Sequence, residues 1–142
     1  KLPSTTRSLP IALIRARERV MAPYRDMLAN TGITEQQWRV LRVLSESGSL
    51  DTSTLAQRAS LLFPSLTRIA TTMRAKGLIT QTQDTKDRRR QLVAITAQGH
   101  KVIDDHLPQA AKIIADLKAE VGAERYENLL DLLALLDPDA RD

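Results

Sequence analysis

The pattern of apolar and polar positions predicts a helix at the start of the chain. Between residues 9 and 30, apolar side chains recur at intervals of three or four positions, and this spacing places them on one face of an α-helix. Pro10 falls in the first turn, where the missing N–H of proline costs nothing. Pro23 lies inside the same segment, and we expect it to kink the helix.

Three shorter helices are predicted next. Thr34 opens a capping-box pattern, and the helix that follows it is expected to bury Trp38, Leu41 and Leu44. Residues 48–77 read as two further helices separated by a tight turn. Asp51 or Thr52 can cap the first of these two helices, and Pro64 suits the first turn of the second.

A β-hairpin is predicted after these helices. Residues 78–83 and 91–96 carry β-branched residues in partial alternation, a pattern typical of short strands. The segment between them is charged and includes three consecutive arginines, Arg88 to Arg90. The sequence therefore predicts a hairpin with a long basic tip.

The end of the chain reads as helical, with a break at Gly122 and a stop at Pro138. Six leucines fall within eight positions near the end: Leu129, Leu130, Leu132, Leu133, Leu135 and Leu136. A helix this apolar has to be covered on more than one side. Intertwined terminal helices of a two-fold dimer would cover it, and the alternative is a central position in a monomeric core.

Residues 66–76 form a predicted helix with two contrasting faces. The apolar stripe consists of Leu66, Ile69, Ala70 and Met73, and the polar face of Thr67, Arg68, Thr71 and Thr72. Short hydroxyl side chains beside an arginine suit a helix in the major groove of DNA, where Arg68 can donate to O6 and N7 of guanine. An ordinary solvated face is the alternative. The short helix, tight turn and basic hairpin around this helix follow the order of a winged helix-turn-helix, which favours DNA binding.

Composition limits the class of protein without deciding its function. With 21 Lys and Arg against 17 Asp and Glu, the net charge is +4, which permits a polyanionic partner without requiring one. The absence of cysteine excludes disulfides and thiolate nucleophiles and fits a reducing, cytoplasmic setting. No apolar run approaches the ~18 residues of a membrane span.

Enzyme chemistry finds little support in the sequence. His100 and Asp104 stand four positions apart, with Asp105 and His106 nearby, but no cysteine or third histidine completes a metal site. Solvated charges on a helix are the simpler interpretation. A glycine-rich phosphate loop and a nucleophile beside a base are both missing, so we expect no catalysis, no metal and no cofactor.

Three segments carry a family resemblance: TEQQWRVLRVL, TSTLAQRASLLFPSLTRIATTMRAKGLI and DTKDRRRQLVAITAQG. They resemble the MarR family of bacterial transcriptional regulators over nearly the whole chain, and ALIRARERVMAPYRDML looks most like the subgroup that controls homoprotocatechuate (4-hydroxyphenylacetate) degradation operons. The resemblance implies a mainly α fold with a small β-hairpin, in one MarR-type domain that spans residues 1–142. Within it, residues 34–96 would form the winged helix-turn-helix DNA-binding lobe, and residues 9–31 and 97–142 the dimerisation helices.

The resemblance also implies DNA-contacting residues. It puts the helix at about 64–76 in the major groove and the wing in the minor groove. Asp87, Arg88 and Arg89 match the family's wing pattern, whereas Arg90 and Gln91 stand where many relatives have small or apolar residues. The expected DNA-binding residues are Ser65, Thr67, Arg68, Thr71, Thr72, Lys86, Arg88, Arg89 and Arg90.

Each wing residue has an expected task. Asp87 is expected to hold the guanidinium of Arg89, Arg88 or Arg89 to enter the minor groove, and Arg90 to contact a phosphate. If these residues lie along an extended strand, Arg88 and Arg90 point to one side and Arg89 to the other.

Cations beside an aromatic ring suggest a small-molecule site. The expected ligand-binding residues are Arg15, Arg17, Trp38, Arg39 and Arg42. An arginine beside an aromatic ring suits an aromatic carboxylate, by bidentate pairing and stacking. The alternative is that these arginines pair with Glu18, Glu35 or Glu46.

The sequence thus predicts a homodimeric repressor of an aromatic-compound catabolic operon, released from palindromic double-stranded operator DNA by a small aromatic carboxylate effector. Two alternatives stay open. One is a constitutive, ligand-free DNA-binding or architectural protein. The other is a protein-interaction module whose hairpin docks an acidic partner.

Overall fold

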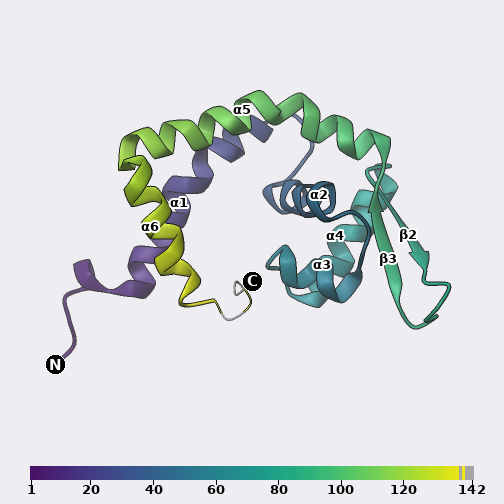
Figure 1. Ribbon diagram of the computed structural model, residues 1–142, viewed down its shortest axis with the longest axis horizontal. Coiled ribbons are helices and arrows are strands. Elements are labelled where there is room, and N and C mark those ends of the chain that lie inside the picture. The colour runs from purple at the N-terminus through teal and green to yellow at the C-terminus, as the bar shows by residue number, and fades with distance from the viewer. Residues whose placement is uncertain (138, 140–142) are drawn as a thin grey trace. The chain divides into compact units, whose positions relative to one another are not determined.

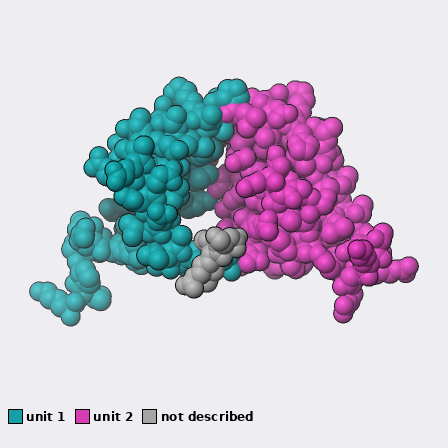
Figure 2. Space-filling view, viewed as in Figure 1, with its two compact units in different colours: residues 1–24, 108–142 teal, residues 25–107 magenta. Residues whose placement is uncertain are grey.

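The computed structural model describes residues 1–137 and 139. The chain divides into two compact units: unit 1 contains residues 1–24 and 108–142, and unit 2 contains residues 25–107 (Figure 2). The winged helix-turn-helix lobe expected at 34–96 falls inside unit 2. The helix stop expected at Pro138 lies outside the described residues.

Helices dominate both units (Figure 1). The elements, in chain order, are η1 (Thr5–Arg7), α1 (Leu9–Leu28), α2 (Glu35–Ser47), β1 (Leu50–Asp51), α3 (Thr52–Arg58), α4 (Phe63–Ala75), β2 (Ile79–Gln83), β3 (Gln91–Ile95), α5 (Ala97–Val121) and α6 (Ala123–Ala134). The mainly α fold with a small β-hairpin is therefore confirmed. No helix among residues 1–137 is long and apolar enough to cross a membrane.

Local capping determines where several helices begin. The Thr34 hydroxyl accepts from the Gln37 N–H, and the Gln37 side chain accepts from the Thr34 N–H, so the predicted capping box is present. Asp51 caps α3 through a 2.7 Å bond from the Thr54 N–H. Helix α1 continues past Pro23 to Leu28, and the kink at Pro23 stays a prediction.

The hairpin is confirmed, and a third strand joins it. Strands β2 and β3 pair antiparallel from Ile79 opposite Ile95 to Gln83 opposite Gln91. Strand β1 pairs with the other edge of β3, with Leu50 opposite Val93. Strand β1 was not predicted, because two residues are too few to show an alternating pattern.

The core of unit 2 lies where α2, α3 and α4 meet the sheet. Its most buried large side chains are Leu41, Leu44, Leu55, Leu66, Met73, Val40 and Val93. Gly99, in the first turn of α5, permits a close approach, because a Cβ there would clash with the Leu78 carbonyl oxygen and the Ile95 side chain. This contact ties the start of α5 to the sheet.

Unit 1 differs from unit 2 in the burial of its side chains. None of its described residues is buried, and α6 exposes Leu129, Leu130, Leu132 and Leu133. Within unit 1, the Arg19 guanidinium of α1 pairs with the Glu120 carboxylate of α5. The interpretation of α6 as the centre of a monomeric core is therefore wrong, since a core helix would bury these leucines.

Candidate nucleic-acid interface

Helices α3 and α4 are joined by a tight turn. The Leu61 N–H donates to the Ala56 carbonyl at 2.9 Å, and Ser60 adopts a left-handed backbone with φ of 54°. Helix α4 then starts at Phe63 with Pro64 in its first turn. Gly77, with φ of 76°, follows its last turn and leads into β2. The predicted order of helix, turn, helix and hairpin is present.

The two predicted faces of α4 are confirmed. Its buried residues are Leu66, Ile69, Ala70 and Met73. Thr67, Arg68, Thr71 and Thr72 are exposed, and Ser65 is half-buried. The core contacts thus fix the rotation of α4 and leave its polar face accessible to a partner.

The threonines of this face do not point their hydroxyl hydrogens outward. The Thr67 hydroxyl donates to the Phe63 carbonyl at 3.1 Å, and the Thr71 hydroxyl donates to the Thr67 carbonyl at 3.0 Å. Thr72 makes a longer contact of the same kind, 3.5 Å to the Arg68 carbonyl. These side chains therefore offer a partner a methyl group and an acceptor lone pair instead of an outward donor.

The hairpin tip is a tight turn that exposes its cations. The Arg90 N–H donates to the Asp87 carbonyl at 3.0 Å, which puts Arg88 and Arg89 at the corners of a β-turn. The Asp84 N–H donates to the Arg90 carbonyl at 2.9 Å and closes the loop below it. Lys86, Arg88, Arg89 and Arg90 are all exposed. Alternation along a strand was the wrong description of these arginines, because β3 begins only at Gln91.

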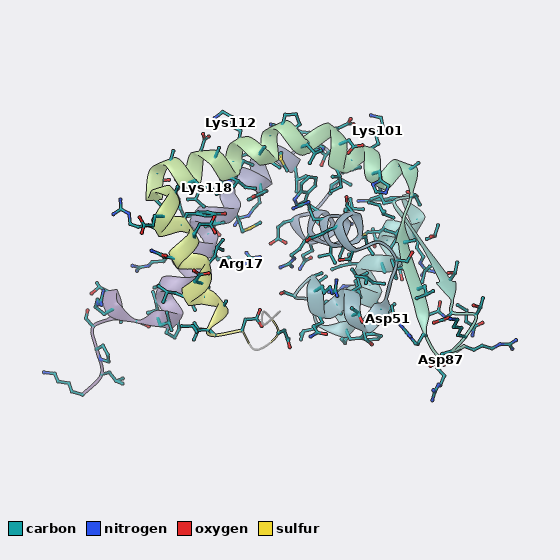
Figure 3. The ribbon with its side chains drawn as sticks, in the orientation of Figure 1. Arg17, Asp51, Asp87, Lys101, Lys112 and Lys118 are labelled. Atoms are coloured by element: carbon teal, nitrogen blue, oxygen red, sulfur yellow. The ribbon has the colours of Figure 1, made fainter. Side chains whose placement is uncertain are left out.

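Asp87 holds Arg89, as predicted. The Arg89 Nε donates to Asp87 Oδ1 at 3.1 Å, and its Nη2 lies 3.4 Å from Oδ2. The Arg89 backbone N–H also donates to Oδ1, at 3.0 Å. The side-chain and backbone bonds from Arg89 lower the pKa of Asp87. Arg89 nevertheless exposes 91% of its side chain, so Asp87, which Figure 3 labels at the hairpin tip, orients Arg89 without covering it.

Arg90 has protein partners. Its Nη2 donates to Asp51 Oδ2 at 2.6 Å, and its Nη1 lies 3.9 Å from Asp84 Oδ2. The pKa of Asp51 is lowered, first by the Thr54 backbone N–H and also by Arg90. The expectation that Arg90 contacts a phosphate stays a prediction, and the observed bond gives Arg90 a task within the protein.

The five expected ligand residues fall in two groups. Arg15 and Arg17 are exposed on α1 in unit 1, and Arg17 is labelled in Figure 3. Trp38, Arg39 and Arg42 lie on α2 in unit 2. Arg15 and Arg17 therefore belong to a different unit from Trp38, Arg39 and Arg42.

Around Trp38 the structure adds a neighbour that the sequence did not suggest. Trp38 is only 5% exposed, and its ring meets that of His106 edge-on at 5.9 Å. Arg39 Nη2 lies 3.6 Å from Glu35 Oε2, as the ion-pair alternative expects, while its Nε is buried with no hydrogen-bond partner among the described residues. Arg42 is exposed.

Metal-binding geometry does not occur in the part of the chain that the structure describes, where no three His, Asp or Glu side chains come together. Lys101 donates to the Asp105 carboxylate at 2.7 Å, and this bond raises the pKa of Lys101. His106 directs its Nδ1 to the Val102 carbonyl, 2.7 Å away. Asp105 and His106 thus already have partners of other kinds.

Each unit contains a pocket, and none of the five expected ligand residues lines either of these two pockets. The pocket in unit 2, of about 380 Å³, is lined by Thr31, Gly32, Ile33, Lys76, Leu78, Gln98, Val102, Asp105 and His106. The pocket in unit 1, of about 230 Å³, lies among α1, α5 and α6 and includes Arg19, Tyr24 and Tyr126. His106 connects the first pocket to the ring of Trp38.

Comparison with known proteins gives consistent matches. Residues 33–90 match the MarR family. The chain is 37% identical to the HTH-type transcriptional regulator FarR of Neisseria gonorrhoeae, covering 91% of this chain and 88% of FarR. It is also 37% identical to the homoprotocatechuate degradative operon repressor of Escherichia coli, covering 89% and 85%. A crystal structure of NadR in complex with 4-hydroxyphenylacetate superposes with a TM-score of 0.82 at 37% identity, covering 96% of each chain.

Proposed function

Because the chain belongs to the MarR family of transcriptional regulators, we propose that it is a homodimeric repressor of an aromatic-compound catabolic operon. In this proposal it binds a palindromic DNA operator in the cytoplasm and leaves it when a small aromatic acid binds. It makes no chemical change to the acid or to the DNA. One observation carries the proposal: the exposed face of α4 and the exposed cations of the hairpin tip occur in one winged helix-turn-helix.

Helix α4 is the proposed reader of base sequence. Its apolar stripe is buried, so the opposite face is the one that a major groove can receive. Arg68, exposed on that face, would donate to guanine. The proposed contacts of this helix come from Ser65, Thr67, Arg68, Thr71 and Thr72.

The hairpin tip is the proposed minor-groove contact. A narrow A·T-rich minor groove concentrates negative potential and attracts inserted arginine. Asp87 orients Arg89 and leaves it 91% exposed, so less side-chain entropy is lost when Arg89 enters the groove. Lys86 and Arg88 are exposed beside it and supply charge for the phosphates.

The proposed dimer follows from the apolar surface of unit 1. Helix α6 buries none of its residues, and Leu132 is 61% exposed. Leucines exposed in such number mark an interface. A two-fold pairing of the terminal helices would cover them and set two copies of α4 about 34–36 Å apart, one turn of DNA.

A small aromatic acid is the proposed effector. NadR was crystallised with 4-hydroxyphenylacetate, and another relative represses a homoprotocatechuate degradative operon. In this chain, Arg39 and Arg42 lie one and four positions after Trp38 on α2, and a guanidinium can pair with a carboxylate through two parallel hydrogen bonds. The proposed ligand residues are Arg15, Arg17, Trp38, Arg39 and Arg42.

A ligand-free repressor is the second candidate, because the ion pair between Arg39 and Glu35 gives this arginine a partner inside the protein. Both candidates bind DNA, and they differ only in the response to an effector.

The test starts with selection of duplexes from a random library by the purified full-length chain. Enrichment of a palindromic sequence is expected, and binding to it should weaken when 4-hydroxyphenylacetate is added. An unrelated acid of the same charge, such as acetate, is the control. If no duplex is enriched, the proposed function is wrong. If a duplex is enriched but aromatic acids leave its affinity unchanged, the ligand-free candidate holds.

A further inference from the structure

Two large apolar side chains stand exposed at the start of α4. Leu62 is 77% exposed and Phe63 is 50% exposed. Leu62 occupies the N-cap position of the helix and makes no side-chain capping bond. A Ser, Thr, Asp or Asn side chain at this position would cap the helix, which leucine does not do. A buried leucine would stabilise the fold, but Leu62 is exposed. Neither capping nor burial therefore explains why a leucine stands here.

These side chains continue into the exposed face of α4. Phe63, Thr67 and Thr71 follow one another at intervals of four residues, so they line one side of the helix. The hydroxyl hydrogens of the two threonines are used by carbonyls of the helix itself. The row therefore presents mainly carbon, with Arg68 next to it as a strong donor.

DNA offers one apolar group on the base edges of its major groove, the C5-methyl of thymine. The residues at the N-terminal end of a recognition helix are those that reach base edges. An apolar row that begins at this end and is continuous with the proposed DNA-contacting face suits thymine methyl groups.

We propose that Leu62 and Phe63 contact thymine C5-methyl groups in the major groove, and that they make the chain select thymine at those positions of its operator. The proposal rests on the proposed function, since it names the bases that the start of α4 reads. Arg68 reads guanine further along the helix.

The first test removes only the methyl groups. The duplex that the wild-type chain enriches from a random library is compared with the same duplex carrying deoxyuridine in place of thymine, one position at a time. Deoxyuridine keeps the base pairing and the hydrogen-bonding groups of thymine. At the contacted positions we expect affinity to fall roughly fourfold for each buried methyl group removed.

The second test uses variants that keep the fold. Leu62→Ser supplies a side chain that caps helices, so its thermal midpoint should equal or exceed that of wild type while operator affinity falls. Phe63→Ala removes the other side chain. In each variant, the loss of affinity caused by deoxyuridine should shrink at the position that the removed side chain contacts and persist at the other positions. Leu2→Ser, at a leucine that is 91% exposed, is the matched control and should keep every penalty.

Three results overturn the proposal. The selected operator could lack thymine in its α4-contacted positions, wild type could bind thymine and deoxyuridine equally well, or both variants could keep the full penalties. Each of these leaves DNA binding intact and is thus distinct from failure of the proposed function, in which wild type enriches no duplex. If the apolar row binds a protein instead of DNA, the variants should lose that protein partner while they keep operator affinity and thymine preference.

Discussion

Arg90 and Asp51, which stand 39 positions apart in the sequence, are joined by a 2.6 Å hydrogen bond from Nη2 to Oδ2. Asp51 caps α3 through the Thr54 N–H and also belongs to β1, which pairs with β3. One carboxylate therefore links the base of the hairpin tip to the first helix of the helix-turn-helix. In Figure 3, Asp51 lies beside α3 and Asp87 at the hairpin tip.

The first prediction separates the two tasks of Asp51. Asp51→Ala should lower the free energy of unfolding by about 1–2 kcal/mol, because the helix cap is lost along with the ion pair. Asp51→Asn keeps an acceptor for the Thr54 N–H and should cost less than about 1 kcal/mol. Urea titration of both variants measures the difference. Equal losses in the two variants would mean that the cap is not the main contribution.

The same carboxylate predicts a dependence on pH. The pKa of Asp51 is lowered from 3.8, first by the Thr54 N–H and also by Arg90. The unfolded chain therefore takes up this proton before the folded protein does, so stabilisation by Asp51 is present above pH 3.8 and is lost as the pH falls through the folded pKa.

We expect the difference in unfolding free energy between wild type and Asp51→Ala to stay constant above about pH 5 and to shrink below pH 3.8. Comparison with Asp51→Ala cancels the other carboxylates, which the two proteins share. A difference that stays constant down to about pH 2 would show that Asp51 is not stabilised as an anion.

Local signals allowed much of this fold to be predicted from the sequence. The Thr34 capping box, the Asp51 cap, Gly77 after α4 and the hairpin each depend on residues close together in the chain. The pairing of Asp87 with Arg89 was predictable for the same reason, since two positions separate them.

Other features depend on relationships that a sequence does not display. The bond between Arg90 and Asp51 requires the register of β1 on β3, and β1 is too short to leave a pattern. The hydroxyls of Thr67 and Thr71 can point outward or toward the helix, and the sequence does not distinguish these two rotamers. Arg88 and Arg89 lie in a turn and not in an extended strand, because the Arg90 N–H bonds to the Asp87 carbonyl.

The dimer prediction concerns the exposed leucines of α6. Removal of residues 128–142 should leave a monomeric, aggregated or unfolded protein, since several kcal/mol of leucine burial is lost. Leu132→Glu is a milder test, because Leu132 is already 61% exposed in the single chain. It should shift the dimer toward monomer in light scattering, whereas Leu2→Glu should not. A truncated chain that stays dimeric and binds operator would rule out this interface.

The effector prediction concerns Arg17 of α1 and Arg39 of α2. Arg17→Ala or Arg39→Ala should blunt the response to 4-hydroxyphenylacetate and leave ligand-free operator affinity nearly unchanged, because an effector acts only through affinity that differs between two states. Lys112→Ala, which removes a cation paired with Asp116, is the control. If both arginine variants respond like wild type, these residues are not part of the effector site.

The arginines of the hairpin tip are expected to have unequal roles in DNA binding. Arg88→Ala and Arg89→Ala should each weaken operator binding by about 1–3 kcal/mol and make the salt dependence shallower by roughly one phosphate contact. Arg90 is held by Asp51. Arg90→Ala should therefore change the salt dependence of operator affinity less than Arg88→Ala or Arg89→Ala does. Arg68→Ala should instead relax base preference.

The most direct measurement is operator affinity as a function of salt for wild type and the double variant Arg88→Ala/Arg89→Ala. We expect the double variant to bind more weakly at physiological salt, by about 2–6 kcal/mol, with a slope that is shallower by roughly two phosphate contacts. Wild-type affinity with an unchanged slope would contradict this expectation, since the hairpin would then be a solvated loop and not a DNA-binding wing.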